Sequence, residues 1–321
     1  MFKVAELAKS IEDYVNRFFI GNRQVVHIVT ASLLANGHVL LLGPVGSGKT
    51  TLAKALAKAI GGSFGRVQVT NETLPSDIIG FATYTPNGEV RIIKGPIFNN
   101  IVLIDEINRA PARTLSALLE AMQEGQVTIE GKSMSLPRPN MIIATMNVTE
   151  IALGAASALP LALLDRFMVS AYVGYADANY EKLIVRGIDA IEDGLSISNH
   201  NPQLANSLDG VNSEVRGVYI DDAVLDYMHR LINRIRGDSR VAVMLSTRAL
   251  VSMYKLARVI ALMDGRNYVI PDDVKAIAHP VLDHRIIVKP EFRDSVSASS
   301  IVDDALASVE PPVYVASNAQ H

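Results

Sequence analysis

The segment LLGPVGSGKT, from Leu41 to Thr50, contains residue types that bind the phosphate groups of a nucleotide. Its pattern Gly43-x-x-x-x-Gly48-Lys49-Thr50 has the spacing of a phosphate-binding loop. Glycine lets the backbone point its N–H groups inward, and these donors favour a polyanion together with the start of the following helix. We expect Lys49 to reach the β- and γ-phosphates and Thr50 to ligate Mg²⁺. The expected nucleotide contacts of the loop are Gly43, Pro44, Val45, Gly46, Ser47, Gly48, Lys49, Thr50 and Thr51.

A pair of acids follows a second apolar segment, IVLIDE, which ends in Asp105 and Glu106. An acid in this position sits at the carboxyl edge of a parallel sheet, where a phosphate loop also lies. We expect Asp105 to hold Mg²⁺, directly or through water, and Glu106 to orient and deprotonate the attacking water. The alternative interpretations are an ordinary glycine-rich turn for the loop and a helix-capping pair for the acids.

These two features alone do not distinguish a kinase, a GTPase and an ATPase. A GTPase is expected to carry an Asn-Lys-x-Asp motif for guanine, and the chain has none. A small-molecule kinase of this fold tends to be compact and to lack a separate helical domain. The pattern of the rest of the chain therefore favours an oligomeric ATP-driven motor.

The elements that must position these residues alternate between helical and strand patterns up to about residue 175. Short apolar runs bounded by turn residues are typical of strands buried on both faces of a parallel sheet. Alternation of such strands with helices predicts a three-layer α/β sandwich. Helices are expected at 3–19, 22–36, 50–61 and 112–125, and strands at 38–43, 66–70, 101–107, 140–147 and 167–175.

The pattern changes to amphipathic helices after residue 176. These helices are expected at 178–190, 221–236, 247–264 and 272–286, with a polar, turn-rich insert at 193–214. We therefore divide the chain into an α/β core (1–175), a smaller all-helical domain (176–290) and a C-terminal tail (291–321).

The composition excludes several other classes of protein. With no cysteine among its 321 residues, the chain has no disulfide, thiolate metal site or cysteine nucleophile. The net charge of −3 and the absence of tryptophan do not suggest a surface for nucleic acid. The seven histidines show no metal-ligand spacing. We see neither a signal peptide nor a long apolar span, so we expect a cytoplasmic protein that does not insert into membranes.

The segment IDEINRAPARTLSALLEAMQEGQVTIEGK (104–132) resembles the signature of the MoxR family of AAA+ ATPases. The resemblance extends from about residue 5 to residue 288, is weak in 190–220 and is absent from the tail. It implies an AAA+ three-layer core with a parallel sheet, followed by a helical lid domain.

The resemblance also assigns roles to residues outside the loop and the acids. FIGNRQ (19–24) resembles the segment in which Ile20 and Gly21 border the adenine. Hairpin inserts are expected near 81–98 and 126–137. The Asn87-Gly88 pair independently predicts the first of these turns. In the family such inserts project toward the central pore of a ring, and the alternative for this chain is surface decoration.

Three polar residues match the family's sensors and its arginine finger. Asn147 matches the first sensor, which contacts the γ-phosphate or the attacking water. Arg166, in LLDRF, matches the arginine finger that enters the neighbouring subunit's site, and Arg248, in LSTRAL, matches a second sensor acting on its own subunit's nucleotide. The alternatives are a turn asparagine, an Asp165–Arg166 surface pair and a solvated arginine at a helix start.

The chain departs from the family after its fourth expected strand. Met146 replaces the usual glutamine before the sensor asparagine, and the following loop, 148–160, lacks the family's acidic Gly-Thr-Tyr-Pro-like pattern. This difference affects the expected assembly and client, but not the nucleotide chemistry.

The implied activity is Mg²⁺-dependent ATP hydrolysis by a homo-oligomeric ring, for which we expect a hexamer. The ring would remodel or mature a protein client in a chaperone-like way, in partnership with a protein bearing a von Willebrand factor A domain. Two alternatives stay open. A nucleic-acid motor has support only from Arg91, Lys94 and Lys132 in the hairpins. A nucleotide-gated scaffold would bind ATP with little turnover.

Overall fold

The computed structural model describes residues 2–87, 89–147, 159–196 and 210–312. Within them, a sheet of five parallel strands has the order β2-β5-β8-β1-β9. Four of the strands fall within segments that the sequence predicted as strands, and β2 begins two residues before the strand predicted at 66–70. The strands are β1 (His38–Leu42), β2 (Phe64–Gln68), β5 (Ile101–Asp105), β8 (Met141–Met146) and β9 (Phe167–Tyr172).

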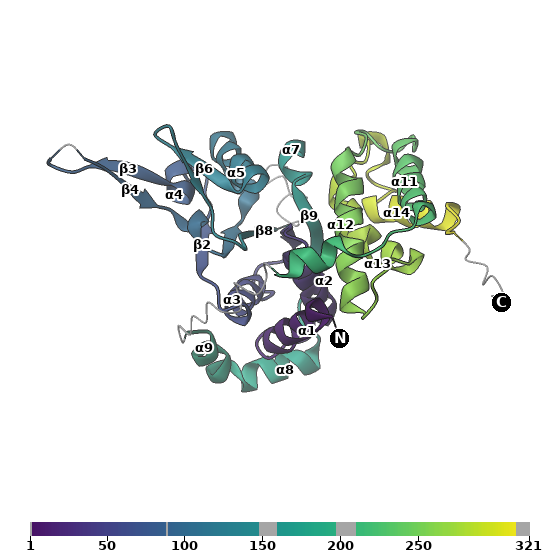
Figure 1. Cartoon of the computed structure of the whole chain (residues 1–321), viewed down its shortest axis with the longest axis horizontal. Helices are drawn as coiled ribbons and strands as arrows, with labels where there is room; N and C mark the ends of the chain where they lie inside the picture. The colour runs from purple at the N-terminus through teal and green to yellow at the C-terminus, as the bar shows by residue number, and fades with distance from the viewer. Residues whose placement is uncertain (1, 88, 148–158, 197–209, 313–321) are drawn as a thin grey trace.

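Helices cover both faces of this sheet, which confirms the predicted three-layer α/β architecture (Figure 1). Successive side chains of a strand point to opposite faces, so Leu41 belongs to one apolar core and Leu40 to the other. The first core includes α1 (Lys3–Val15), α2 (Arg23–Leu34) and α3 (Lys49–Ala59). The second includes α4 (Pro75–Ile79) and α5 (Ala112–Glu124), with η1 (Pro96–Phe98) and η2 (Ile107–Arg109) beside them.

Two antiparallel hairpins interrupt the core where the sequence predicted them. β3 (Gly80–Tyr84) pairs with β4 (Val90–Lys94), and β6 (Gln126–Ile129) pairs with β7 (Lys132–Ser135). The first hairpin extends away from the sheet (Figure 1). Gly88, half of the predicted turn, lies outside the described residues, as do residues 197–209 of the polar insert predicted at 193–214. The described ends of that insert, 193–196 and 210–214, are helical and not loops.

A group of helices lies to one side of the sheet and forms the lid (Figure 1). It contains α11 (Asp222–Arg236), α12 (Thr247–Met263), α13 (Pro271–Leu282) and α14 (Ala298–Ser308), with short turns η3 (Asp283–Arg285) and η4 (Pro290–Phe292). α12 packs against α1 and α2, which joins the lid to the first apolar core. Short α7 (Leu161–Leu164) precedes β9 at the border between core and lid.

The structure differs from the sequence prediction at the two ends of the helical region. α8 (Ala178–Arg186) and α9 (Ile188–Ser196) lie beneath α1 and α3, away from the other lid helices (Figure 1). Lys58 of α3 donates to the carbonyl of Gly194 at 2.9 Å. These two helices therefore belong with the core, and we propose that the lid begins after them.

The expected tail is also wrong in part, because residues 298–308 form α14. Ile301, Val302 and Ala305 of this helix are buried against α11 and α13. Their spacing places three apolar side chains on one face of the helix, and this face completes the lid core.

Candidate nucleotide site

The predicted phosphate loop lies between the end of β1 and the start of α3. Gly46 and Gly48 have φ values of 80° and 86°, a region that favours glycine. Gly43 has little space around it, because a Cβ there would lie 2.1 Å from the carbonyl oxygen of Val173. The loop glycines are thus required by backbone geometry, and α3 begins at Lys49 with its N-terminus at the loop.

A cavity of about 360 Å³ opens at this edge of the sheet. It brings together the phosphate loop, both acids and Asn147, although these come from segments far apart in the sequence. The lining residues are Gly43, Val45, Gly46, Ser47, Gly48, Lys49, Thr50, Thr51, Arg66, Gln68, Asp105, Glu106, Thr145, Met146 and Asn147. The carboxyl ends of parallel strands meet here, which is where open α/β sheets bind ligands.

The ammonium group of Lys49 is held inside the loop. Its Nζ donates to the carbonyls of Gly43 (3.1 Å) and Pro44 (2.6 Å) and to Ser47 Oγ (3.1 Å). Burial lowers the pKa of Lys49, while the nearby charges of Asp105 and Glu106 oppose that shift. The lysine thus presents its charge to the cavity from a fixed position.

Asp105 is buried and has a partner on each carboxylate oxygen. Thr145 donates from Oγ1 to Oδ1 at 2.8 Å, and Arg66 donates to Oδ2 from Nη2 at 2.7 Å and from Nε at 3.0 Å. Charge-assisted pairs of this kind fix both position and orientation. Arg66 on β2 therefore neutralises the acid that the sequence assigned to the metal.

Glu106 has an unusual backbone, with φ of 57° in the left-handed region. This conformation costs a non-glycine residue about 1 kcal/mol or more. Two contacts hold it: the Glu106 N–H donates to Thr145 Oγ1 at 2.9 Å, and its carboxylate pairs with Arg109 Nε at 3.0 Å. One hydroxyl, that of Thr145, thus positions both acids.

The oxygen atoms of Asp105 and Thr50 are suitable ligands for a small divalent cation. Mg²⁺ prefers oxygen ligands, and it is bound through one or two carboxylates together with substrate phosphates. The Asp105 carboxylate and the Thr50 hydroxyl line the same cavity, beside the loop that would hold the phosphates. These residues fit the metal that the sequence predicted.

A second cavity, of about 430 Å³, adjoins the phosphate loop. Its walls are mainly apolar and include the predicted residues Ile20 and Gly21, and it shares Gly46, Ser47, Gly48 and Thr51 with the first cavity. Phe18, Phe19, Tyr175, Ile184, Ile188 and Ile191 also line it. The position of this cavity next to the loop suits the base and ribose of a nucleotide.

The two predicted arginines lie together, but at the amino end of β1, opposite the end that carries the phosphate loop. Arg166 and Arg248 line a cavity of about 210 Å³ that also includes His38, the first residue of β1. Both arginines donate to Gln123 Oε1. The phosphate loop follows the last residue of β1, and the ends of a strand of 5 residues are roughly 15 Å apart.

Arg248 therefore does not line the phosphate cavity of its own chain, where its predicted role in contacting that chain's nucleotide would place it. The lid packs so that the N-terminus of α12, which carries Arg248, faces Asp165 and the beginning of β9. Arg248 also acts on its neighbour electrostatically. Burial lowers the pKa of Arg166, and the positive charge of Arg248 lowers it further.

Several polar residues of these sites were not singled out from the sequence. Thr145 is a polar residue within an apolar strand, and Arg66 lies on the strand that pairs with β5. The positions of Thr145 and Arg66 near Asp105 can be recognised in the sequence once the order of the strands is known. Gln123 could not be found in this way, because it lies on a helix far from the arginines in sequence.

Comparison with known proteins identifies the class. Residues 38–169 match the family described as "ATPase family associated with various cellular activities (AAA)", and residues 234–305 match the "AAA lid domain". A crystal structure of a putative ATPase from Cytophaga hutchinsonii superposes with a TM-score of 0.85 at 32% identity, covering 97% of this chain and 96% of that one. Fold and matches together define a AAA+ ATPase with a helical lid.

Two curated relatives narrow the class. The uncharacterized protein YeaC of Bacillus subtilis is 38% identical over 310 residues, which cover 96% of this chain and 95% of YeaC. Chaperone MoxR1 of Mycobacterium tuberculosis is 33% identical over 311 residues, covering 93% of this chain and 80% of MoxR1. The chain belongs to the MoxR family of AAA+ ATPases.

Proposed function

We propose that this chain hydrolyses ATP with Mg²⁺ as a ring-shaped cytoplasmic homo-oligomer, with six protomers as the expected number. The ring uses the hydrolysis to remodel or mature a protein client, and a protein with a von Willebrand factor A domain assists it. Family membership supports the ATPase activity. The name of the relative MoxR1 supports chaperone-like work.

One observation carries the proposal: the groups needed for hydrolysis lie at opposite ends of the strands of the same sheet. Lys49, Asp105 and Glu106 line the phosphate cavity, whereas Arg166 and Arg248 line the cavity at the beginning of β1. Among the described residues, Arg66 is the one arginine that lines the phosphate cavity, and it is paired with Asp105; Arg166 and Arg248 of the same chain do not line that cavity. A head-to-tail arrangement of copies would supply Arg166 and Arg248, and such an arrangement forms a ring when the rotation between copies closes.

The proposed roles follow from these positions. Lys49 and the loop N–H groups hold the β- and γ-phosphates, and Glu106 accepts a proton from the attacking water. The amide of Asn147 orients that water or the γ-phosphate. Arg166 and Arg248 of the next protomer stabilise the charge that develops as the phosphoryl group transfers.

Thr50 and Asp105 would hold Mg²⁺, which supplies positive charge to the phosphate oxygens when bound. Thr145 keeps Asp105 and Glu106 in their relative positions through its single hydroxyl. Arg109 holds the Glu106 carboxylate by an ion pair. Because phosphoryl transfer depends mainly on positioning and charge, these contacts are expected to set kcat.

The proposal is tested by measuring ATPase activity per chain as a function of protein concentration. We expect the specific activity to rise with concentration and to reach a plateau where the oligomer forms. Arg166→Ala should lower that plateau by about 10³-fold, the smaller end of the effect of an arginine finger. A constant specific activity across a range in which the protein is a monomer would contradict it.

A further inference from the structure

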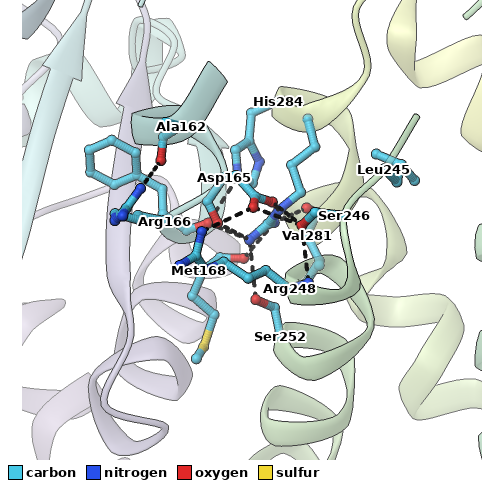
Figure 2. A network of polar contacts seen from close by, with 12 residues as sticks. Ala162, Asp165, Arg166, Met168, Leu245, Ser246, Arg248, Ser252, Val281 and His284 are labelled. Atoms are coloured by element: carbon cyan, nitrogen blue, oxygen red, sulfur yellow. Dashed lines mark hydrogen bonds and ion pairs between the residues drawn. The ribbon is translucent and has the colours of Figure 1, made fainter. Parts of the chain in front are cut away.

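The carboxylate of Asp165 lies at the junction between the core and the lid (Figure 2). It accepts hydrogen bonds from Ser246 Oγ at 2.8 and 2.7 Å and from Arg285 Nε at 3.2 Å. Arg248 Nη1 lies 3.6 Å from Oδ2. The partners all come from the lid, while Asp165 precedes β9 of the core.

Arg285 is the most buried member of this cluster, with 2% of its side chain exposed. Besides the Asp165 carboxylate, it donates to backbone carbonyls of the core and to one acceptor each on α12 and α13 of the lid. These further acceptors are the carbonyls of Asp165 (3.2 Å), Phe167 (2.7 Å), Met168 (3.2 Å) and Val281, and Ser252 Oγ (3.1 Å).

A buried guanidinium needs an acid, because burying a charge without a counter-ion is costly. Burial lowers the pKa of Arg285 to about 10, and the Asp165 charge opposes that shift. Arg285 therefore stays charged near neutral pH. Its firm attachment to Asp165 fixes the start of β9 against the lid.

Ser246 links the same carboxylate to the start of α12. Its Oγ accepts the Arg248 N–H at 3.0 Å, which caps the helix, and its hydroxyl donates to Asp165. Arg248 thus lies two residues after Ser246, which contacts Asp165 directly. Arg166 is the residue that follows Asp165 in the chain. Both arginines are tied to one carboxylate.

We propose that Asp165, held by Arg285 and Ser246, is a positioning residue that sets Arg166 and Arg248 of one protomer for the nucleotide of the neighbouring protomer. A shift of the lid would move both arginines together through this contact. The inference rests on the proposed function, because it assumes that Arg166 acts in the neighbouring site.

Asp165→Asn tests the proposal, because it keeps the size of the side chain and removes its charge. In rings made only of this variant, we expect kcat to fall at least tenfold. KM for ATP should change less than twofold, because each chain keeps its own phosphate and base cavities.

Mixed rings separate a role in the neighbouring site from a role in the chain's own site. Glu106→Gln chains cannot activate water but retain intact arginines. When Asp165→Asn chains are mixed with an equal amount of them, we expect the rate per Asp165→Asn chain to recover toward about half the wild-type value, since random mixing gives half the sites an intact neighbour. No recovery would overturn the proposal.

The control for the proposed function is the same mixture with Arg166→Ala in place of Asp165→Asn. If that mixture fails to recover, the neighbouring role of Arg166 is what has failed. If it recovers while the Asp165→Asn mixture does not, Asp165 only supports its own chain, and this inference alone is overturned.

Two further variants guard against a simple folding defect. Asp273→Asn removes another buried lid carboxylate, which accepts from Arg266 at 2.6 and 2.8 Å, and it should leave kcat near wild type even if Tm falls.

Ser246→Ala keeps the Asp165–Arg285 pair and removes the link to α12. It should lower kcat several-fold and recover in the mixture with Glu106→Gln. A Ser246→Ala kcat equal to wild type would also overturn the proposal.

Discussion

At the scale of single residues, Thr145 shows how much of the site depends on one hydroxyl. It donates to Asp105 and accepts from the backbone of Glu106, whose conformation is strained. An apolar residue of the same shape would leave a carboxylate oxygen and an N–H without this partner.

Thr145→Val should therefore destabilise the protein by about 1–3 kcal/mol, the cost of leaving a buried polar group unpaired. It should also lower kcat for ATP more strongly than it changes KM. Thermal unfolding and steady-state kinetics would measure these effects. Thr145→Ser restores the hydroxyl and should recover most of kcat; a Thr145→Val enzyme with full kcat would contradict the assigned role.

Arg66 competes with Mg²⁺ for the carboxylate of Asp105. Its guanidinium pairs with Asp105 Oδ2, so any cation that binds there must share or displace it. Arg66→Ala should lower the Mg²⁺ concentration that half-saturates nucleotide binding, by a few-fold, since an ion pair this exposed contributes only about 1 kcal/mol.

A fluorescent ATP analogue titrated with Mg²⁺ would measure this shift without relying on turnover. Arg109→Ala is the matched control, because Arg109 Nε pairs with Glu106, which we assign to the attacking water and not to the metal. The competition is refuted if Arg66→Ala needs more Mg²⁺ than the wild type.

At the scale of elements, α14 is part of the lid core although its sequence is rich in serine and alanine. Ile301 is 1% exposed and packs in the first apolar core. Ile301→Ala should cost about 2–5 kcal/mol, the usual range for such a truncation in a core. The exposed Ala307→Ser change should cost less than about 0.5 kcal/mol. Equal midpoints of urea unfolding for the two variants would show that α14 adds nothing to the lid.

The same elements show which parts of the fold could be predicted from the sequence. The five strands and the first hairpin were predictable because apolar runs and the Asn87-Gly88 pair are local signals, whereas the second hairpin was expected from the family resemblance. α14 was missed because its small residues give a weak apolar pattern. The position of α8 and α9 against the core depends on tertiary packing, which periodicity does not encode.

The candidate site divides in the same way. The phosphate loop, Asp105, Glu106 and Asn147 line one cavity because each follows a strand of one parallel sheet, which the sequence indicates. The end of the sheet's strands at which Arg248 lies was not predictable from the sequence. It depends on how α12 docks against the core, through contacts with Asp165 that join residues distant in the chain.

At the scale of the whole molecule, our proposal divides one site between the two ends of the strands of the sheet. One end has the phosphate cavity and the acids, and the other has a like-charged pair of arginines. Copies related by a rotation could bring these ends together around the nucleotide. Among the described residues, no helix is long and apolar enough to cross a membrane.

Assembly should also determine how the protein holds a client. Glu106→Gln is expected to bind ATP without cleaving it, so the ring would stay closed around its partner. A pull-down with this variant should recover a client protein in ATP and lose it when Lys49→Ala is added, because that change removes the lysine that we propose to hold the phosphates. Recovery that is equal with and without ATP would argue against a nucleotide-driven client cycle.

The most direct measurement of the central claim is the ATPase rate of rings mixed from Arg166→Ala and Glu106→Gln chains. Each variant alone should be nearly inactive, one for lack of the neighbouring arginine and the other for lack of the water-activating acid. If neighbouring protomers complete the site, mixing should restore turnover at the Arg166→Ala chains that have a Glu106→Gln neighbour. A mixture no more active than the sum of its parts, under conditions where wild-type chains exchange between rings, would contradict the account.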